Sequence, residues 1–596
     1  MSTSQTPLRG RKPGDRRVRV ERPHADYFRY SGEGMLIAKE TASAPRTGLG
    51  RMLARGRSVL FGRPLSTHEE ITERLSKKHA LAIFSSDAIS SSAYATEEIL
   101  RVLVLAGTGA LLLSLPIGIG IALLLAVVST SYRQEVHAYP SGGGDYAVAR
   151  ANLPSLSALV VAGALLVDYV MTVAVSTTSA VEQVISAVPG LSDVRVEIGV
   201  VAILLIMLGN LRGLRESGNI FALPTYLFIG SALLAIGIGT IRIVIFGEHG
   251  APPSPLPGEP SPIQAVTVLL VIRAFASGSV ALTGTEAIAN GVPAFKPPES
   301  RNAATTLTAV AILLGVLFIG ITFVADSFGV VPIDQPATKT VISQVAAIAY
   351  GDGSLGFYLF QTFTALILFL AANTSFNAFP RLAAILARDG YMPRQLSFRG
   401  DRLAFTSGII ILSLAAITLV VGFGARTTAL VPLYAVGVFV AFTIGQVGMV
   451  RHWLTTRERG WHWRLGINAF GALLTSTVFV VVLIAKAPTS LLVAVIIPVL
   501  VSIMLFIHSQ YSRSAAQLAI RPGAVFRGPT REERVIVPVA GVNRAVVQAV
   551  NVGRSIAADV RAVLISDEAD EANRVREAWE RHIPNVPLVI VESPYR

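Results

Sequence analysis

ALAIFSSDAISSSAYATEEIL, residues 80–100, begins as an apolar helix of the membrane type and then interrupts itself with polar side chains. Asp87 stands among five serines, and Tyr94, Thr96, Glu97 and Glu98 follow it. A carboxylate at membrane depth costs about 2.5–3.5 kcal/mol on insertion scales, so it is tolerated where it faces a cavity, a partner or an ion. The stretch therefore predicts a membrane helix that is broken at a polar site.

The composition of the chain agrees with a membrane protein. Of its 596 residues, 52% are hydrophobic and only 15% are charged, which is typical of a polytopic membrane protein. Cysteine is absent, which excludes a disulfide framework, a thiolate metal site and a cysteine nucleophile. The net charge is +13, and residues 1–60 hold 13 Lys and Arg against 5 Asp and Glu. This distribution favours contact with an anionic inner leaflet over binding of nucleic acid.

Apolar stretches of spanning length follow one another from residue 79 onward, and they predict an all-α polytopic membrane protein with twelve transmembrane helices. The expected spans are 79–104, 107–131, 155–187, 196–211, 220–246, 263–291, 304–326, 354–387, 405–423, 428–450, 465–486 and 490–510. The spans at 155–187 and 354–387 are longer than a bilayer requires, which indicates tilt.

The loops between the spans predict the orientation. Those rich in Lys and Arg, such as 387–402 and 451–464, alternate with loops that are poor in both, such as 248–262. We therefore expect both termini to be cytoplasmic in a multi-pass protein of the plasma membrane. The Gly-rich loop 139–154 lacks the Gly-Lys-Ser/Thr ending of a phosphate-binding loop, so we expect a re-entrant or interfacial segment.

The predicted domains are three. Residues 1–77 form a basic, mostly disordered cytoplasmic tail, and residues 78–512 form the transmembrane domain. Residues 530–596 form a small cytoplasmic α/β domain, because strand patterns alternate there with helical patterns. The expected strands are 534–540, 560–566 and 586–592, and the expected helices are 543–558 and 568–582.

A second polar interruption predicts an internal repeat. FASGSVALTGTEAIANG, residues 275–291, lies in the sixth span and combines Gly278 and Gly284 with Thr283 and Glu286. The broken helices are the first and the sixth expected spans, so each repeat would contain five spans, and this odd number would invert the second repeat relative to the first. We therefore expect a 5+5 inverted repeat with both breaks at mid-membrane.

A third intramembrane acid lies within LLVDYVMTVAVS, residues 165–176, where Asp168 and Thr172 share one helix face next to Tyr169. Together with Asp87, Tyr94, Thr283 and Glu286, these residues offer only oxygen ligands, which hard cations prefer. Glu286 and Asp168 are also candidates for carrying a coupled proton, since buried carboxyls titrate. Other roles remain open at this point: Asp87 as a helix N-cap, Asp168 as a partner of an arginine and Glu286 as a vestibule residue. Glu97 and Glu98 fit an outer vestibule better than the ion site.

Five stretches resemble the KimA-type potassium importers of the amino acid–polyamine–organocation superfamily, which are related to the KUP potassium uptake transporters. They are 78–100, LLVDYVMTVAVS (165–176), ALTGTEAIANGVPAFKPPESRNAATTL (281–307), NTSFNAFPRLAAILARDGYMPRQLSFRGDRL (373–403) and LVPLYAVGVFVAFTIGQVGMVRHW (430–453). The resemblance covers roughly residues 65–596. It implies high-affinity potassium–proton symport by a LeuT-type fold of twelve helices.

The resemblance also implies a ligand set. Potassium would be bound by Asp87, Tyr94, Asp168, Thr172, Thr283 and Tyr434, with Tyr169 and Glu286 close by. Tyr434 follows from the resemblance only. The family further implies a homodimer and a universal-stress-type cytoplasmic domain, at which some members bind a cyclic dinucleotide. Here the C-terminal unit stops after its third strand, where the family's domain continues, so we expect neither nucleotide binding nor dimerisation to carry over automatically.

Two other functions are compatible with parts of the sequence. An amino-acid permease of the same superfamily would use half-helix N-termini and Gly-rich breaks to receive a carboxylate, but Asp87 in the first break would repel that group. A membrane-tethered nucleotide sensor would need a Gly-rich phosphate loop after 534–539, where only GVNR (541–544) is present. No nucleophile–base pair suggests an enzyme, and no cofactor is expected beyond the transported potassium.

Overall fold

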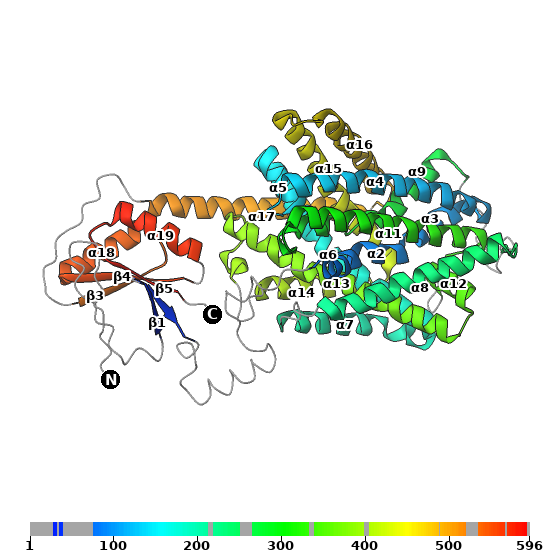
Figure 1. Cartoon of the computed structure of the whole chain (residues 1–596), viewed down its shortest axis with the longest axis horizontal. Coiled ribbons are helices and arrows are strands. Elements are labelled where there is room, and N and C mark those ends of the chain that lie inside the picture. Colours follow the sequence, from blue (N-terminus) through cyan, green and yellow to red (C-terminus); the bar gives the residue numbers. More distant parts are fainter. Residues whose placement is uncertain are drawn as a thin grey trace.

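The computed structural model describes residues 28–32, 35–39, 76–212, 218–250, 265–332, 339–398, 405–487, 489–519, 534–566 and 569–592. Most of the tail 1–77, the loop at 251–262 and the C-terminal residues 593–596 lie outside these ranges. The described residues form a bundle of long helices and a separate small sheet with helices (Figure 1).

Ten helical segments within the described residues are long and apolar enough to cross a membrane. They contain α4 (Ser114–Ala138), α6 (Ser155–Ala187), α7 (Arg195–Leu211), α8 (Gly218–Val244), α9 with α10 (Val268–Gly278 and Glu286–Asn290), α11 (Glu299–Ser327), α13 (Leu355–Arg388), α15 (Thr427–Thr456), α16 (Trp461–Ala485) and α17 (Thr489–Leu518). The chain is therefore a multi-pass membrane protein.

The other helices are shorter. They are α2 (Lys77–Ser90), α3 (Ala95–Leu103), α5 (Gly144–Asn152), α12 (Val341–Tyr350) and α14 (Thr406–Gly422). The sequence predicted twelve spans, and all twelve stretches are helical. Two of them fall outside the ten long spans, because the first is divided between α2 and α3 and α14 has only 17 residues. Helix α12, which the sequence analysis did not predict, is an additional short segment.

The share of each helix that is buried shows which helices lie at the centre of the bundle and which lie at its surface. In α6, 89% of the most apolar window is buried, whereas the value is 22% for the span containing α7 and 28% for both α16 and α17. A helix that is apolar on all sides and buried on all sides belongs to the interior. Helix α6 therefore lies at the centre of the bundle. The exposed apolar faces of α7, α16 and α17 are suited to contact with lipid.

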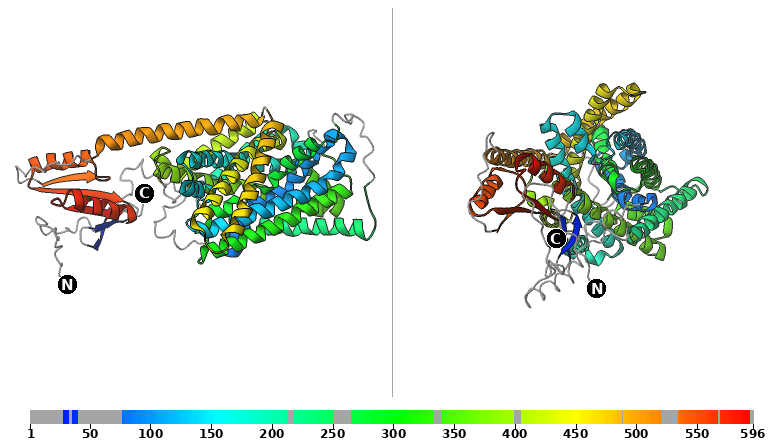
Figure 2. Two further views of the ribbon diagram at one scale, coloured as in Figure 1. Left: turned by 90° about the horizontal axis from the view of Figure 1, so that it is seen from above. Right: turned by 60° about the vertical axis from the view of Figure 1, so that its left-hand side comes forward.

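The two ends of the bundle differ. One end, called the near end here, is where α17 leaves the bundle toward the α/β unit (Figure 2). It also holds the end of α13 and α5, because Arg150 pairs with Asp389 at 2.7 Å, and Tyr391 stacks on His508 of α17. The opposite end is called the far end. The Arg-rich segment at 387–398 therefore lies at the near end. The segment at 451–464 lies at this end too, because the Tyr139 hydroxyl contacts His452 at 3.1 Å and accepts from Asn152 of α5. This agrees with the loop pattern expected for one side of a membrane.

The α/β unit has the alternating order expected from its sequence. Strands β3 (Arg534–Val539), β4 (Asp559–Ser566) and β5 (Leu588–Glu592) are parallel, and α18 (Arg544–Ile556) and α19 (Ala569–His582) connect them. Trp579 is fully buried beneath the sheet, and its indole N–H donates to the Val586 carbonyl at 2.8 Å. This pairing satisfies the one polar atom of a large buried side chain.

Two short segments of the N-terminal tail, which was predicted to be mostly disordered, form strands. The tail contributes β1 (Phe28–Gly32) and β2 (Met35–Ala38), which form an antiparallel pair, and β2 adds in parallel to β5. The sheet order is β1-β2-β5-β4-β3. The reason is that β5 would otherwise be an edge strand with unpaired backbone groups, and a short tail segment satisfies them.

Candidate functional site: two broken helices around buried acids

The first membrane segment is broken as its sequence predicts. Helix α2 ends at Ser90, a 3₁₀ turn covers Ser91–Ala93, and α3 begins at Ala95. The Ser91 hydroxyl donates to the Ala88 carbonyl at 2.6 Å and contacts the Ala281 carbonyl at 2.9 Å. Since Ala281 lies in the other interrupted segment, this serine ties the two breaks together.

The second break follows the same plan. Helix α9 ends at Gly278, a 3₁₀ turn covers Ser279–Leu282, Thr283 is extended, and α10 begins at Glu286. Gly284 has a φ of +83°, a left-handed conformation that favours glycine. A Cβ at Gly284 would lie 2.6 Å from the Ala88 nitrogen and 2.8 Å from the Asp87 carboxyl carbon. Only glycine therefore lets the second break approach Asp87 this closely.

Three buried carboxylates face this junction. Asp87 is 5% exposed and its Oδ2 accepts from the Thr374 hydroxyl at 3.1 Å. Asp168 and Glu286 are 1% and 2% exposed, and each keeps one carboxylate oxygen without a hydrogen-bond partner. The other oxygen of Glu286 accepts from the Gly284 N–H at 3.2 Å. Asp168 interacts electrostatically with both Glu286 and Asp87. Unsatisfied buried carboxylate oxygens are costly unless a cation or a proton joins them.

Hydroxyl groups complete the lining from four different elements. A side-chain hydrogen bond joins Tyr94 to Thr283, and the Thr172 hydroxyl lies 3.2 Å from the Tyr434 hydroxyl. Tyr434 lies on α15, which can approach Asp168 because Gly437 faces α6: a Cβ there would lie 3.2 Å from the Ala164 carbonyl. The structure thus brings six of the predicted ligands together with Glu286.

Tyr169 has a separate place in the structure. Its hydroxyl accepts from the Asn290 amide at 2.8 Å, at the end of α10. It is therefore positioned to hold α10 against α6. Thr374 is a further residue at the site, which the sequence analysis did not single out. The polar run NTSFN at 373–377 was the available signal, since it interrupts an otherwise apolar stretch of α13.

The donor set is oxygen alone. Among the described residues, no three Asp, Glu or His side chains gather as a metal-binding group. A cation at this junction would consequently be held by a mixture of separate carboxylates, hydroxyls and the carbonyls that the helix breaks release from intrahelical bonding. Carboxylate, hydroxyl and carbonyl oxygens are the ligands that hard cations prefer, and broken membrane helices supply such carbonyls.

Comparison with known proteins places the chain in a family. The amino acid permease family model matches residues 75–507, and the KimA potassium transporter C-terminal domain model matches residues 531–596. The potassium transporter KimA of Bacillus subtilis (strain 168) is 41% identical over 539 residues, which cover 90% of this chain and 87% of that protein.

The chain belongs to the KimA family. Like other KimA and amino acid permease proteins it is a transporter and not an enzyme. Solved structures with lower similarity include a mutant of the manganese transporter of Eremococcus coleocola, at 12% identity and a TM-score of 0.36 over 73% of this chain and 92% of that one. The same transporter with a bis-isothiourea compound gives 14% identity and a TM-score of 0.36, covering 75% and 96% of the two chains.

In this KimA-family chain, α5 lies at the near end and packs against α6, α10 and α15. Asp145 of α5 is 2% exposed and accepts from the Tyr132 hydroxyl at 2.7 Å. A Cβ at Gly445 of α15 would lie only 1.8 Å from the Asp145 Oδ1, so α5 and α15 are in direct contact at this glycine. Burial raises the pKa of Asp145 to about 7, although the Tyr132 hydrogen bond works in the opposite direction. The predicted interfacial segment is thus a short helix packed inside the protein. Its acid was missed because GGGDY reads as a loop.

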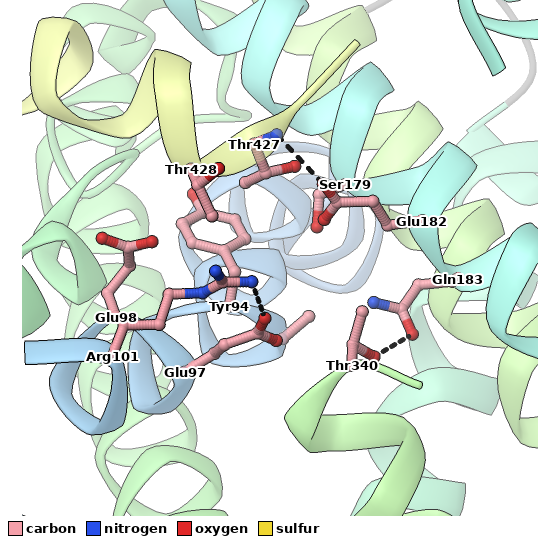
Figure 3. A pocket seen from close by; sticks show the side chains of 11 residues that line it. Tyr94, Glu97, Glu98, Arg101, Ser179, Glu182, Gln183, Thr340, Thr427 and Thr428 are labelled. Atoms are coloured by element: carbon pink, nitrogen blue, oxygen red, sulfur yellow. Dashed lines mark hydrogen bonds and ion pairs between the residues drawn. The ribbon is translucent and has the colours of Figure 1, made fainter. Parts of the chain in front are cut away.

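At the far end, Glu97 and Glu98 line a small cavity together with Tyr94 (Figure 3). Tyr94 also belongs to the ligand set described above, so the cavity lies directly against the buried site. This position is the one expected for a vestibule.

Proposed function

We propose that this protein takes up potassium with high affinity across the plasma membrane by secondary active symport with protons. The observation that carries the proposal is the pair of buried carboxylate oxygens on Asp168 and Glu286 that have no hydrogen-bond partner, next to Asp87 at the crossing of two broken helices. A site of this kind is stable when a cation or protons neutralise it. The 41% identity to a potassium transporter supports potassium as the cation.

Six residues would bind potassium: Asp87, Tyr94, Asp168, Thr172, Thr283 and Tyr434. Tyr169, close to them, supports α10. Glu286 would exchange the coupled proton, with Asp168 as the second candidate. The Glu286 Oε1 contact with the Gly284 N–H supports this role, because it anchors the carboxyl at the break where the cation would arrive. A proton on Glu286 removes one negative charge from the site, so binding and protonation are linked.

The wider architecture proposed is a LeuT-type 5+5 inverted repeat of twelve spans, in which α2–α3 and α9–α10 occupy equivalent positions. The near end would face the cytoplasm, with both termini there. This is supported by the Arg-rich segments gathered at that end. The proposed domains are residues 1–77, 78–512 and 530–596. We also propose that the protein is a homodimer. A nucleotide such as a cyclic dinucleotide is the candidate regulator of the α/β domain.

A proton-coupled amino-acid permease is the second candidate, since the matching family model carries that description. Such a carrier binds the substrate carboxylate at half-helix N-termini. Here Asp87 precedes the first break, and Glu97 and Glu98 occupy the first turn of α3. These acids oppose an anionic group, and this favours the cation.

The test uses a bacterial host that lacks its own potassium uptake. Wild-type protein should restore growth and rubidium uptake at micromolar external potassium, and Asp87→Asn should not, although the exposed change Glu197→Gln should. Collapse of the proton gradient at fixed voltage should slow uptake. Survival of uptake in Asp87→Asn would contradict the ion site, and uptake unaffected by the collapsed gradient would contradict symport.

A further inference from the structure

The far-end cavity has a charge and an oxygen lining of its own, separate from the buried site beneath it. Three carboxylates line it: Glu97 and Glu98 on α3, and Glu182 on α6. Glu182 interacts electrostatically with Glu97 across the cavity. Figure 3 shows these acids on opposite sides of the cavity, with Tyr94 between them.

Two of these carboxylates are held by backbone N–H groups at helix starts. The Glu97 Oε2 accepts from Val341, the first residue of α12, at 3.0 Å. The Glu182 Oε1 accepts from Thr427, the first residue of α15, at 3.0 Å. The N-terminus of a helix carries partial positive charge and stabilises an anion. Both acids are therefore fixed in place at the cavity wall.

The cationic partners do not balance the acids. Arg101 pairs with Glu97 at 2.5 Å, and Lys486 lies 3.5 Å from Glu98. With all three carboxyls ionised, they exceed these two cationic groups by one negative charge. One monovalent cation then neutralises that excess, whereas a divalent cation would reverse it.

Two neutral oxygen donors lie in the cavity wall. The hydroxyl of Ser179, which is 1% exposed, has no hydrogen-bond partner, and the hydroxyl of Thr427, which is 4% exposed, contacts the Glu182 carboxylate. A buried hydroxyl without a partner is unfavourable unless a ligand or a water joins it. Both stand beside Glu182, Ser179 less than one helical turn before it on α6 and Thr427 through its backbone contact. These hydroxyls and the Glu182 carboxylate are oxygen ligands of the type that alkali cations prefer.

We propose that the far-end cavity binds one monovalent cation, ahead of the buried site, with Glu182, Ser179 and Thr427 as its ligands. This inference rests on the proposed function, because it assigns the cavity to the same transported ion. Tyr94 lines the cavity and belongs to the buried ligand set, so an ion held here is separated from the next site by one side chain. Loading of the cavity would raise the local cation concentration next to Tyr94 and support uptake from dilute solution.

The test counts bound rubidium on the purified full-length protein in lipid nanodiscs. Wild-type protein should hold two rubidium ions per chain, and Glu182→Gln should hold one. The amide oxygen of the glutamine still accepts from Thr427, so the helix contact is kept. Ser179→Ala removes only an unpaired hydroxyl, and it should weaken the second ion several-fold without loss of folding. Glu197→Gln, which removes an exposed charge at the start of α7, is the matched control and should hold two ions.

Uptake kinetics separate this inference from the proposed function. Glu182→Gln should raise the external rubidium concentration for half-maximal uptake by about tenfold, equivalent to about 1.4 kcal/mol, and should leave the maximal rate unchanged. A single bound ion in the wild type, lost in Asp87→Asn, would overturn the far-end site and leave the proposed function intact. Wild-type protein that binds no rubidium would overturn both. Unchanged stoichiometry and affinity in Glu182→Gln and Ser179→Ala would also overturn the far-end site.

Discussion

Gly284→Ala tests the closest contact between the two broken helices. At this position φ is +83°, and a Cβ would meet the Ala88 nitrogen at 2.6 Å and the Asp87 carboxyl carbon at 2.8 Å. Holding a non-glycine residue in the left-handed region costs roughly 1–2 kcal/mol. The steric overlap adds to this cost, because backbone and a buried carboxyl are both in the way.

The structure accommodates alanine only by moving Asp87 or the second break. A displaced Asp87 loses its 3.1 Å contact with Thr374, and a hydrogen bond to a charged group contributes about 1.5–3 kcal/mol. A loss of about 1.4 kcal/mol from cation binding corresponds to tenfold weaker affinity. We therefore expect Gly284→Ala to weaken rubidium binding by about tenfold to a hundredfold.

The assay is equilibrium rubidium binding by the purified variant, with rubidium uptake as a second measurement. Gly315→Ala on α11 is the control, since a Cβ there meets nothing within 4 Å. A helical glycine replaced by alanine in open space should leave binding unchanged and stabilise the fold by about 0.5–1 kcal/mol. A folded Gly284→Ala protein that binds rubidium as tightly as the wild type would refute the reasoning.

Three further predictions concern other parts of the molecule. Burial raises the pKa of Asp145 from its ordinary 3.8 to about 7, so the carboxyl is protonated in the folded protein and ionised in opened α5 between these pH values. As the pH rises from 3.8 to 7, the equilibrium constant for opening α5 should therefore increase by up to about tenfold per pH unit, and above pH 7 it should stay constant. Hydrogen exchange of α5, corrected for intrinsic rate, should show this slope, and Asp145→Asn should abolish it. Tyr434→Phe removes the hydroxyl beside Thr172 and should weaken rubidium binding about fivefold to tenfold, whereas an unchanged affinity would exclude Tyr434 as a ligand. Trp579→Ala should destabilise the α/β unit by about 3–5 kcal/mol in thermal unfolding of the full chain, and rubidium binding should persist.

The polar interruptions could be predicted from the sequence because membrane helices leave few places for acids and hydroxyls. Asp87, Asp168 and Glu286 are conspicuous against apolar surroundings, and the glycines near Glu286 marked the second break. The strands of the α/β unit were equally visible as short β-branched runs between helical patterns. In each case the local residue type determines the local structure.

Other features depend on contacts between distant segments. Thr374 lies in the polar run at 373–377 of α13, but its role follows only from the contact of its hydroxyl with Asp87. Strand β2 forms because the edge of β5 is available, although the two lie at opposite ends of the chain. Tyr434 was found through family resemblance, since nothing in its apolar helix marks it. Sequence patterns do not encode which segments meet.

The most direct test of the central claim is rubidium uptake by the purified protein in liposomes with an imposed inward proton gradient. The account predicts rubidium uptake with micromolar half-saturation, which potassium inhibits and which sodium and amino acids do not inhibit. Asp87→Asn should abolish this uptake, and Glu197→Gln should preserve it. Inhibition by an amino acid, or uptake by Asp87→Asn at the wild-type rate, would contradict a potassium site at the two broken helices.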